Sequence, residues 1–187
     1  APVEQAWYWS NRIKPKEVYR ALHMYFNKNG HWSDGYDMRK DGFSVRPVYG
    51  PIAKEPMPEA VDLGLSVKWA SFNLGASKPE EYGKYYAFAD TKGYTKDESH
   101  DFSWANTPYC TDPSNPGNSS SWSRYNTGDA GLWSCDDAAT VNLGDSWRMP
   151  THDEWKELNE NCTWEWTKRS DVYGYKVTSK KNNNYIF

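Results

Sequence analysis

The chain has 187 residues, with 22 lysine and arginine residues against 25 aspartate and glutamate residues, so its formal net charge is −3. This length predicts one domain, or parts of two. The charge balance excludes a broadly basic nucleic-acid binder. Because no run of 18 apolar residues occurs in the chain, we expect no membrane insertion of this segment.

The composition predicts a folded chain with an aromatic core. There are 11 Trp, 14 Tyr and 6 Phe residues, but only 19 Ile, Leu and Val residues. Disordered chains combine few aromatic residues with high net charge, and this chain has neither property. Low leucine and alanine content argues against a helical bundle. No signal-peptide pattern opens the sequence, as expected for a mature exported form or an excised fragment.

Residues 18–48 read as a compact three-stranded antiparallel unit that follows the aromatic stretch 7–10. Alternation predicts a strand over 18–26, with Val18, Leu22, Met24 and Phe26 facing the core. Asn27-Lys28-Asn29-Gly30 is typical of a hairpin turn. Further strands are expected over 31–37 and 43–48, with a turn at Asp41-Gly42 between them.

Residues 49–59 are proline-rich and predict a linker. A strand is then expected over 61–70, with a possible bulge at Gly64. One helical turn is expected over 79–83, followed by a strand over 84–89. Residues 90–130 are rich in Ser, Asn, Gly, Pro and Asp, and predict a long irregular loop region.

The strongest local signal lies at residues 147–155. Thr151 and Glu154 have the spacing of a capping box, and Trp155, Leu158 and Cys162 follow as the apolar stripe of a helix. A shorter helix is expected to open at 136–139, where acidic residues favour a helix N-terminus. Strands are expected at 164–166 and 173–178, then a turn at 182–184. Because 185–187 begin another strand, we expect the chain to be cut in mid-domain.

Several motifs follow one another along the chain at residues 61–70, 82–88, 136–139, 147–155, 161–164 and 174–177, and closing elements stand at 8–10 and 42–48. Together these motifs resemble a repeated domain of exported Bacteroidales proteins. That family is similar to the formylglycine-generating-enzyme (sulfatase-modifying factor) branch of the C-type lectin-like fold, and is akin to retroelement variable proteins and Fibrobacter succinogenes major paralogous domain proteins. The resemblance implies an α+β, C-type lectin-like fold with short antiparallel sheets, few short helices and long irregular loops.

The segments stand in reversed order relative to that family. Residues 1–48 match its closing segment and residues 60–187 match its opening segment. Residues 49–59 form the expected linker between them. An isolated opening segment would expose strand edges and apolar faces. We therefore expect 1–48 to pack on 60–187, in the same chain or by swapping between neighbours.

The resemblance also bears on catalysis and metal binding. The related enzymes use a pair of cysteines late in the domain, and residues 1–48 contain none, so no enzymatic activity is expected. Cys110, Cys135 and Cys162 fit one bridge plus one free thiol, or three buried thiols. The motifs of calcium-dependent lectins are missing, and no cofactor is expected. Two interpretations stay open for a set of acidic side chains: they bind a structural calcium, or they form a solvated acidic loop. The residues are Asp97, Glu98, Asp101, Asp112 and Asp129.

In the retroelement variable proteins the closing hairpins form the ligand face. The matching stretch here is 9–37, and tyrosine with small polar residues and arginine is typical of adaptable binding surfaces. We expect a non-catalytic, secreted or cell-surface adhesion module that recognises a glycan or protein, with a neighbouring repeat as a further partner; the alternative is a structural spacer. The outward face is expected to present Asn11, Arg12, Tyr19, His23, Tyr25, His31, Ser33 and Tyr36.

Overall fold

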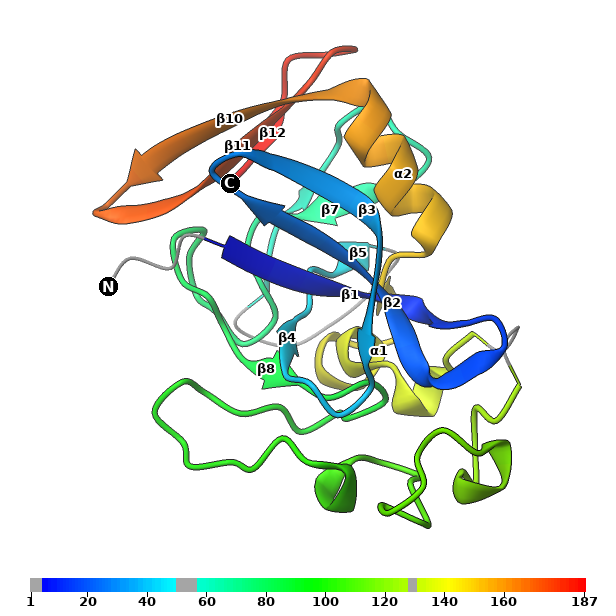
Figure 1. The fold of residues 1–187 in the computed structure, drawn as a ribbon. Helices are drawn as coiled ribbons and strands as arrows, with labels where there is room; N and C mark the ends of the chain where they lie inside the picture. The colour runs from blue at the N-terminus through cyan, green and yellow to red at the C-terminus, as the bar shows by residue number, and fades with distance from the viewer. Residues whose placement is uncertain (1–4, 50–56, 128–130) are drawn as a thin grey trace.

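The structure, a computed structural model, describes residues 5–49, 57–127 and 131–187. Its elements are mostly strands in small sheets, with few and short helices (Figure 1). This confirms the expected α+β class. Residues 50–56 of the expected linker, and Asp129 in the loop region, lie outside the described residues.

The largest sheet has five strands and is built mainly from the N-terminal part of the chain. β1 pairs antiparallel with β2, β2 pairs antiparallel with β3, and β4 adds parallel to β1. A strand from later in the chain, β8, then pairs with β4. In sheet order the strands are β3 (Gly30–Met38), β2 (Glu17–Asn27), β1 (Gln5–Lys14), β4 (Phe43–Ser44) and β8 (Tyr85–Tyr86).

Two smaller sheets complete the strand framework. In the four-stranded sheet, β5 pairs with both β7 and β9, so residues 43–49 supply strands to two different sheets. The three-stranded sheet is a local antiparallel meander at the C-terminal end of the chain. The strands of these two sheets are β6 (Ala60–Val61), β7 (Lys68–Ala70), β5 (Val48–Tyr49) and β9 (Trp147–Arg148), then β10 (Cys162–Arg169), β11 (Val172–Ser179) and β12 (Tyr185–Ile186).

Both α-helices begin at caps that the sequence predicts. Asp137 caps α1 (Ala138–Leu143), and Thr151 with Glu154 forms the capping box of α2 (His152–Asn161). Capping depends on groups within one turn, which is why the local sequence is sufficient to place these helix starts. Three single-turn helices lie in the loops: η1 (Trp104–Asn106), η2 (Ser119–Ser121) and η3 (Ser134–Asp136).

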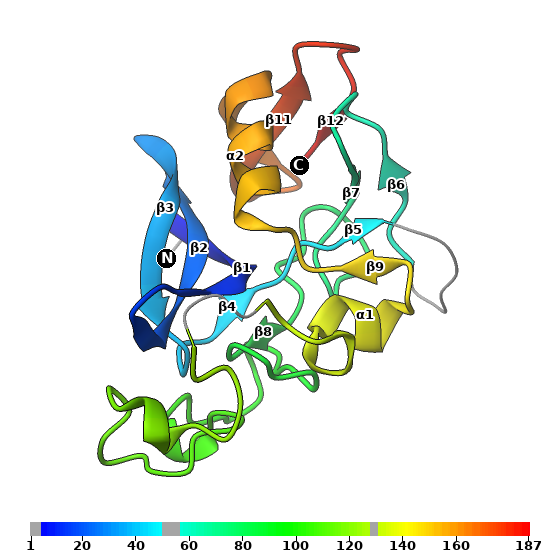
Figure 2. The same cartoon turned by 90° about the vertical axis from the view of Figure 1, so that its right-hand side faces the viewer.

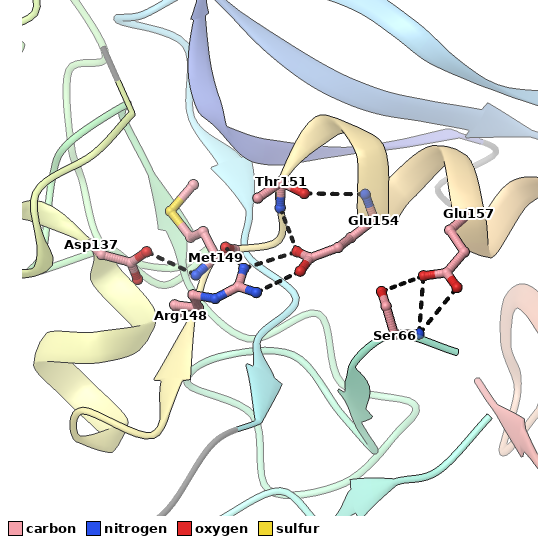
Figure 3. A network of polar contacts seen from close by, with 7 residues as sticks. All are labelled: Ser66, Asp137, Arg148, Met149, Thr151, Glu154 and Glu157. Atoms are coloured by element: carbon pink, nitrogen blue, oxygen red, sulfur yellow. Dashed lines mark hydrogen bonds and ion pairs between the residues drawn. The ribbon is translucent and has the colours of Figure 1, made fainter. Parts of the chain in front are cut away.

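The conspicuous stretch 147–155 forms a polar network that joins α1, β9 and α2 (Figure 3). Asp137 accepts a hydrogen bond from the Met149 amide at 2.8 Å. Arg148 donates to the two carboxylate oxygens of Glu154 at 2.8 and 2.5 Å, and Glu154 also accepts from the Thr151 amide at 2.7 Å. These hydrogen bonds hold α1, β9 and α2 together, which gives the stretch a structural role.

α2 packs across one face of β1, β2 and β3, and the β10–β12 sheet lies on its other side (Figures 1 and 2). Trp155, Leu158 and Cys162 are buried, as the predicted apolar stripe requires. Glu157, on the polar side, accepts hydrogen bonds from the amide and hydroxyl of Ser66 (Figure 3). The helix therefore connects the N-terminal sheet to the segment around Ser66, which lies 91 residues before Glu157 in the chain.

The loop region lies below the five-stranded sheet in Figure 1, and it contains only short 3-10 turns and bridges within the described part of 90–130. Arg39 joins the two: it is fully buried and donates to the carbonyls of Val18 at 2.9 Å and Tyr125 at 3.1 Å. Its guanidinium lies 3.6 Å from the ring centroid of Trp122. Burial lowers the pKa of Arg39 to about 9.

The predicted alternation along β2 holds for only one of its faces. Val18, Leu22 and Met24 are buried as expected, but Ala21 and His23, assigned to the outward face, are also buried at 0% and 5% exposure. The physical reason for His23 is that its imidazole packs edge-on against the rings of Trp9 and Phe43, while Gly35 on the neighbouring strand leaves room for it. A period-two pattern gives the alternation of side chains but not which rings cover the second face.

Three local predictions are wrong. The strand expected over 61–70 is reduced to β6 and β7, because the chain bends between them and Gly64 adopts φ of +68°. Residues 79–83 make turns and no helix. The strand expected over 84–89 is only β8, and Ala89 ends the segment with φ of +69°. In the two strand predictions, a short apolar run was read as longer than its pairing partners allow.

Candidate functional site

Four aromatic rings form a continuous stack across one face of the five-stranded sheet. Phe43 on β4, Trp7 on β1, Tyr25 on β2 and Trp32 on β3 follow one another from strand to strand. The ring centroids are 5.8 Å apart for Phe43 and Trp7, 5.2 Å for Trp7 and Tyr25, and 5.3 Å for Tyr25 and Trp32. The register causes this alignment, since Trp7 pairs with Tyr25 and Tyr25 pairs with Trp32. We call these four residues the aromatic ladder.

The ladder runs from buried to exposed. Phe43 is buried, Trp7 and Tyr25 are half-buried, and Trp32 is 49% exposed at the outer strand of the described sheet. Tyr25 is held in place through its hydroxyl, which donates to Gln5 at 3.3 Å and accepts from the Asn27 side chain at 2.6 Å. Stacked aromatic neighbours and hydrogen-bonded hydroxyls restrict the side-chain rotamers, so the exposed end of the ladder is preorganised.

A hollow of about 340 Å³ opens beside the buried end of the ladder. This volume lies within the range of small-molecule sites. Aromatic rings and carboxylates dominate its walls, and among the described residues that line it none is a lysine or arginine. The lining residues are Gln5, Ala6, Trp7, Asp37, Asp41, Gly42, Phe43, Ser44, Tyr82 and Tyr85.

The two carboxylates of the hollow differ in their partners. Asp41 is bound on both oxygens, by the Lys40 ammonium at 2.9 Å and the Met38 amide at 3.2 Å. Among the described residues, the ion-pair contact of Asp37 is with a histidine, and its Oδ2 atom lies 3.2 Å from Nε2 of His23. Burial lowers the pKa of His23, an effect that the nearby Asp37 and Asp41 charges oppose. His23 is therefore neutral near pH 7, and the charge of Asp37 is left without a cationic partner in this contact.

The structure separates the eight side chains that the sequence assigns to one outward face. His23 and Ser33 are buried, at 5% and 7% exposure, so their assignment to the surface is wrong. His31 lies on the opposite face from Tyr25, because it stacks on Trp164 of β10 with ring centroids 4.3 Å apart. Burial there lowers the pKa of His31.

The other predicted residues lie away from the ladder, toward the end of the sheet where β1 turns into β2. Asn11 and Arg12 border the loop that precedes α1, where the Asn11 carbonyl accepts from the Leu132 amide and Arg12 bridges Gly131. Tyr19 is half-buried and its hydroxyl donates to Glu17 at 3.3 Å. Tyr36 is 41% exposed beneath the Lys14 ammonium, which lies 4.3 Å from its ring centroid. Only Tyr25 belongs to the ladder itself.

Sequence reasoning missed Trp7, Trp32, Asp37 and Tyr82 as members of this site. Trp32 lies within the expected ligand stretch, but alternation counted from β2 did not select it. The signal that could have found it is the Asn27–Gly30 turn, whose register places residues 25 and 32 opposite each other. No local signal brings Tyr82 to the hollow, because its segment arrives through the pairing of β4 with β8.

A second cavity lies between α2 and the β10–β12 sheet, but it is narrow. It holds about 70 Å³, less than small-molecule sites occupy. Arg46 lines it and donates to the carbonyls of Ala70 at 3.0 Å and Phe187 at 2.8 Å. Burial lowers the pKa of this guanidinium. Its donors are engaged by backbone carbonyls, which gives Arg46 a structural role.

The three cysteines are free thiols, with Cys135 exposed, Cys110 half-buried and Cys162 buried. This corrects both sequence interpretations, the bridge and the three buried thiols. Across the described ranges no group of three or more His, Cys, Asp or Glu side chains is placed to hold a metal ion. In the acidic loop, Asp112 accepts from the backbone and hydroxyl of Ser114, and Glu98 accepts from the Thr95 amide at 2.6 Å.

None of the helices in the described part of the chain has the length and apolar character needed to cross a bilayer. Comparison with protein-family models, with curated proteins and with solved structures finds no match to this chain. The candidate site therefore stands on its own geometry: an aromatic ladder with an exposed tryptophan, and a neighbouring hollow that contains a carboxylate.

Proposed function

We propose that this chain is a non-catalytic glycan-binding module that stacks sugar rings on the exposed end of the aromatic ladder. The observation that carries the proposal is the half-exposed Trp32, held by its stack on Tyr25 at the outer edge of the sheet. Rigid aromatic side chains offer large contact areas at low entropic cost. The apolar faces of sugar rings fit such surfaces, while hydroxyls can bond to Gln5 and Asp37 at the hollow.

The wider proposal follows the sequence resemblance. We propose a C-type lectin-like fold for the chain, within an exported or cell-surface bacterial protein whose neighbouring repeat packs beside it. Small antiparallel sheets, short helices and a long packed loop region support this finer assignment without distinguishing it from other α+β folds. In this setting a glycan-binding face would serve adhesion.

The second candidate is a structural spacer without a ligand of its own. In that case the exposed ladder would be covered by a neighbouring repeat, as exposed aromatic patches often are in interfaces. The half-buried positions of Trp7 and Tyr25 fit either candidate. The two differ in whether Trp32 binds a free glycan.

The test compares two tryptophan variants on a glycan array, followed by titration of each bound glycan. Trp32→Ala removes the exposed end of the ladder, and Trp133→Ala is the matched control, because Trp133 is 57% exposed but contacts Tyr125 and Arg124 in the loop region. We expect at least a tenfold loss of affinity in Trp32→Ala, since stacking on one aromatic ring contributes about 1–3 kcal/mol in related recognition of planar rings.

The control variant should bind as the parent chain does. Equal binding by Trp32→Ala would move the site away from the ladder. No binding of any glycan by the folded parent chain would favour the spacer. Folding of each variant is checked by near-ultraviolet circular dichroism, which reports the packed tryptophans.

A further inference from the structure

We propose that the hollow is a subsite for the protonated amine of an amino sugar. This inference rests on the proposed glycan-binding function and adds a ligand class to it. Its basis is the combination of aromatic walls, a carboxylate whose contact with His23 supplies no cation, and an excess of negative charge in one hollow next to the aromatic ladder.

The aromatic walls come from four side chains on different elements. Trp7 and Phe43 belong to the ladder, and Tyr82 and Tyr85 approach from the segment that ends in β8. Faces of aromatic rings attract cations through their quadrupole, and several rings around one site are a common way to bind ammonium groups. A neutral sugar hydroxyl gains nothing comparable from such walls.

The negative charge of the hollow also favours a ligand with an ammonium group. The negative charge of Asp41 is compensated by the Lys40 ammonium at 2.9 Å. Asp37 instead contacts the neutral imidazole of His23, and 43% of its side chain is exposed. An ammonium group entering the hollow would meet this carboxylate, and a carboxylate or sulfate group on an acidic sugar would be repelled by it. The described lining contains no lysine or arginine that could reverse this preference.

The position of the hollow fits a sugar substituent. Trp7 is shared between the ladder and the hollow, so a sugar that contacts the ladder can direct a substituent toward Asp37. The volume of about 340 Å³ accommodates a single sugar unit. His23 lies behind Asp37 and fixes one of its oxygens at 3.2 Å, which leaves the other oxygen for a ligand.

The experiment is an NMR titration of the ¹⁵N-labelled chain with three matched monosaccharides: glucosamine, glucose and N-acetylglucosamine. The indole N–H signals of Trp7 and Trp32 report the hollow and the exposed ladder end separately. We expect glucosamine to shift the Trp7 signal in a saturable way and to bind at least about fivefold more tightly than glucose or N-acetylglucosamine at low salt.

Two asparagine variants test the carboxylate. Asp37→Asn preserves the shape and the contact with His23 but removes the charge, so it should abolish the preference for glucosamine over glucose. Asp34→Asn is the control, because Asp34 lies on the same strand but contacts His152 of α2 at 3.1 Å. It should keep the full preference.

Equal affinities for glucosamine and glucose in the parent chain would overturn the inference, whether both bind or neither does. The glycan-array test with Trp32→Ala is independent of this result, so the proposed function can stand when the amine subsite fails. Nα-acetyl-lysine methylamide is titrated as a further probe. If it shifts Trp7 and glucosamine does not, the amino-sugar assignment is wrong and a protein ligand takes its place.

Discussion

Thr151 shows how much one hydroxyl contributes at the residue scale. Its Oγ1 atom accepts from the Glu154 amide at 3.1 Å, and this bond closes one half of the capping box. The other half returns the Glu154 carboxylate to the Thr151 amide, and the same carboxylate binds Arg148. Burial works against the charge of Glu154, but these bonds prevail and lower its pKa below the ordinary value.

Removing this hydroxyl should destabilise the fold measurably. We expect Thr151→Ala to lower the free energy of unfolding by about 1 kcal/mol, the usual effect of losing an N-cap. Thr151→Ser keeps the hydroxyl and should remain within a few tenths of the parent value. Urea unfolding monitored by tryptophan fluorescence measures both variants. An alanine variant as stable as the serine variant would show that the cap contributes nothing here.

His23 is the second residue whose environment has a measurable consequence. Burial lowers its pKa in the folded chain, whereas in the unfolded chain it titrates near the ordinary value of 6.5. Below that pH the unfolded state binds more protons than the folded state, so stability should fall as the solution becomes more acidic. His31 adds to the same effect, because burial lowers its pKa as well.

We expect the free energy of unfolding to be smaller at about pH 5.5 than at about pH 7.5. The difference should shrink in His23→Gln, which keeps a polar contact to Asp37 but cannot take up the proton. His100→Gln is the control, because His100 stacks on Tyr94 within the loop region and away from the sheet core. A His23→Gln variant with an unchanged pH dependence would contradict the role assigned to the buried imidazole.

At the scale of elements, the segment that carries Tyr82 to the hollow depends on a single glycine. Gly83 adopts φ of +71°, and a Cβ atom at this position would lie 2.3 Å from the carbonyl oxygen of Leu74. That carbonyl accepts from the Lys84 amide at 3.0 Å and closes the loop between residues 74 and 84. Backbone atoms cannot move aside as the end of a side chain can, so the site tolerates only glycine without rearrangement.

Gly83→Ala should therefore cost about 2 kcal/mol of stability, from the left-handed backbone conformation and the steric contact together. Gly131→Ala is the matched control, because the one contact that its Cβ would make with described residues is with the Asn11 carbonyl oxygen at 3.9 Å. Thermal unfolding of the two variants beside the parent chain checks this prediction. Similar melting temperatures for all three proteins would mean that the 74–84 loop is not constrained as described.

At the scale of the whole molecule, the early segment (residues 5–49) and the later segment (residues 57–187) are joined because their strands pair with each other in the same sheets. β4 and β5 come from residues 43–49, yet they pair with β8, β7 and β9 from the later part of the chain. Arg39 adds buried hydrogen bonds from the first segment to Tyr125 in the loop region. The two segments therefore share hydrophobic clusters instead of having one each, as their mixed membership shows.

This arrangement predicts that cutting the chain between the segments leaves them associated. With a specific protease site introduced within residues 50–56, we expect the two cleavage products to elute together in native size-exclusion chromatography. They should separate in urea, because strand pairing and burial hold them and no covalent link remains. Elution at two separate positions under native conditions would contradict the shared sheets.

The sequence by itself determined the features whose causes lie within a few neighbouring residues. The caps at Asp137 and Thr151, the turn at 27–30 and the irregular loop region were all predicted correctly, because capping, turn formation and low apolar content act locally. The aromatic composition also indicated the kind of core, since nothing else in the chain offers comparable apolar area.

Only the tertiary structure decided which side chains share a surface. The register shift between His23 and Tyr25 places Gly35 opposite His23, the β10–β12 sheet brings Trp164 onto His31, and the parallel pairing of β1 with β4 brings Phe43 beside Trp7. Such pairings join residues that are distant along the chain, and a change of one residue in register reverses the faces. For this reason the sequence predicted a binding stretch at 9–37 but not the ladder or the hollow.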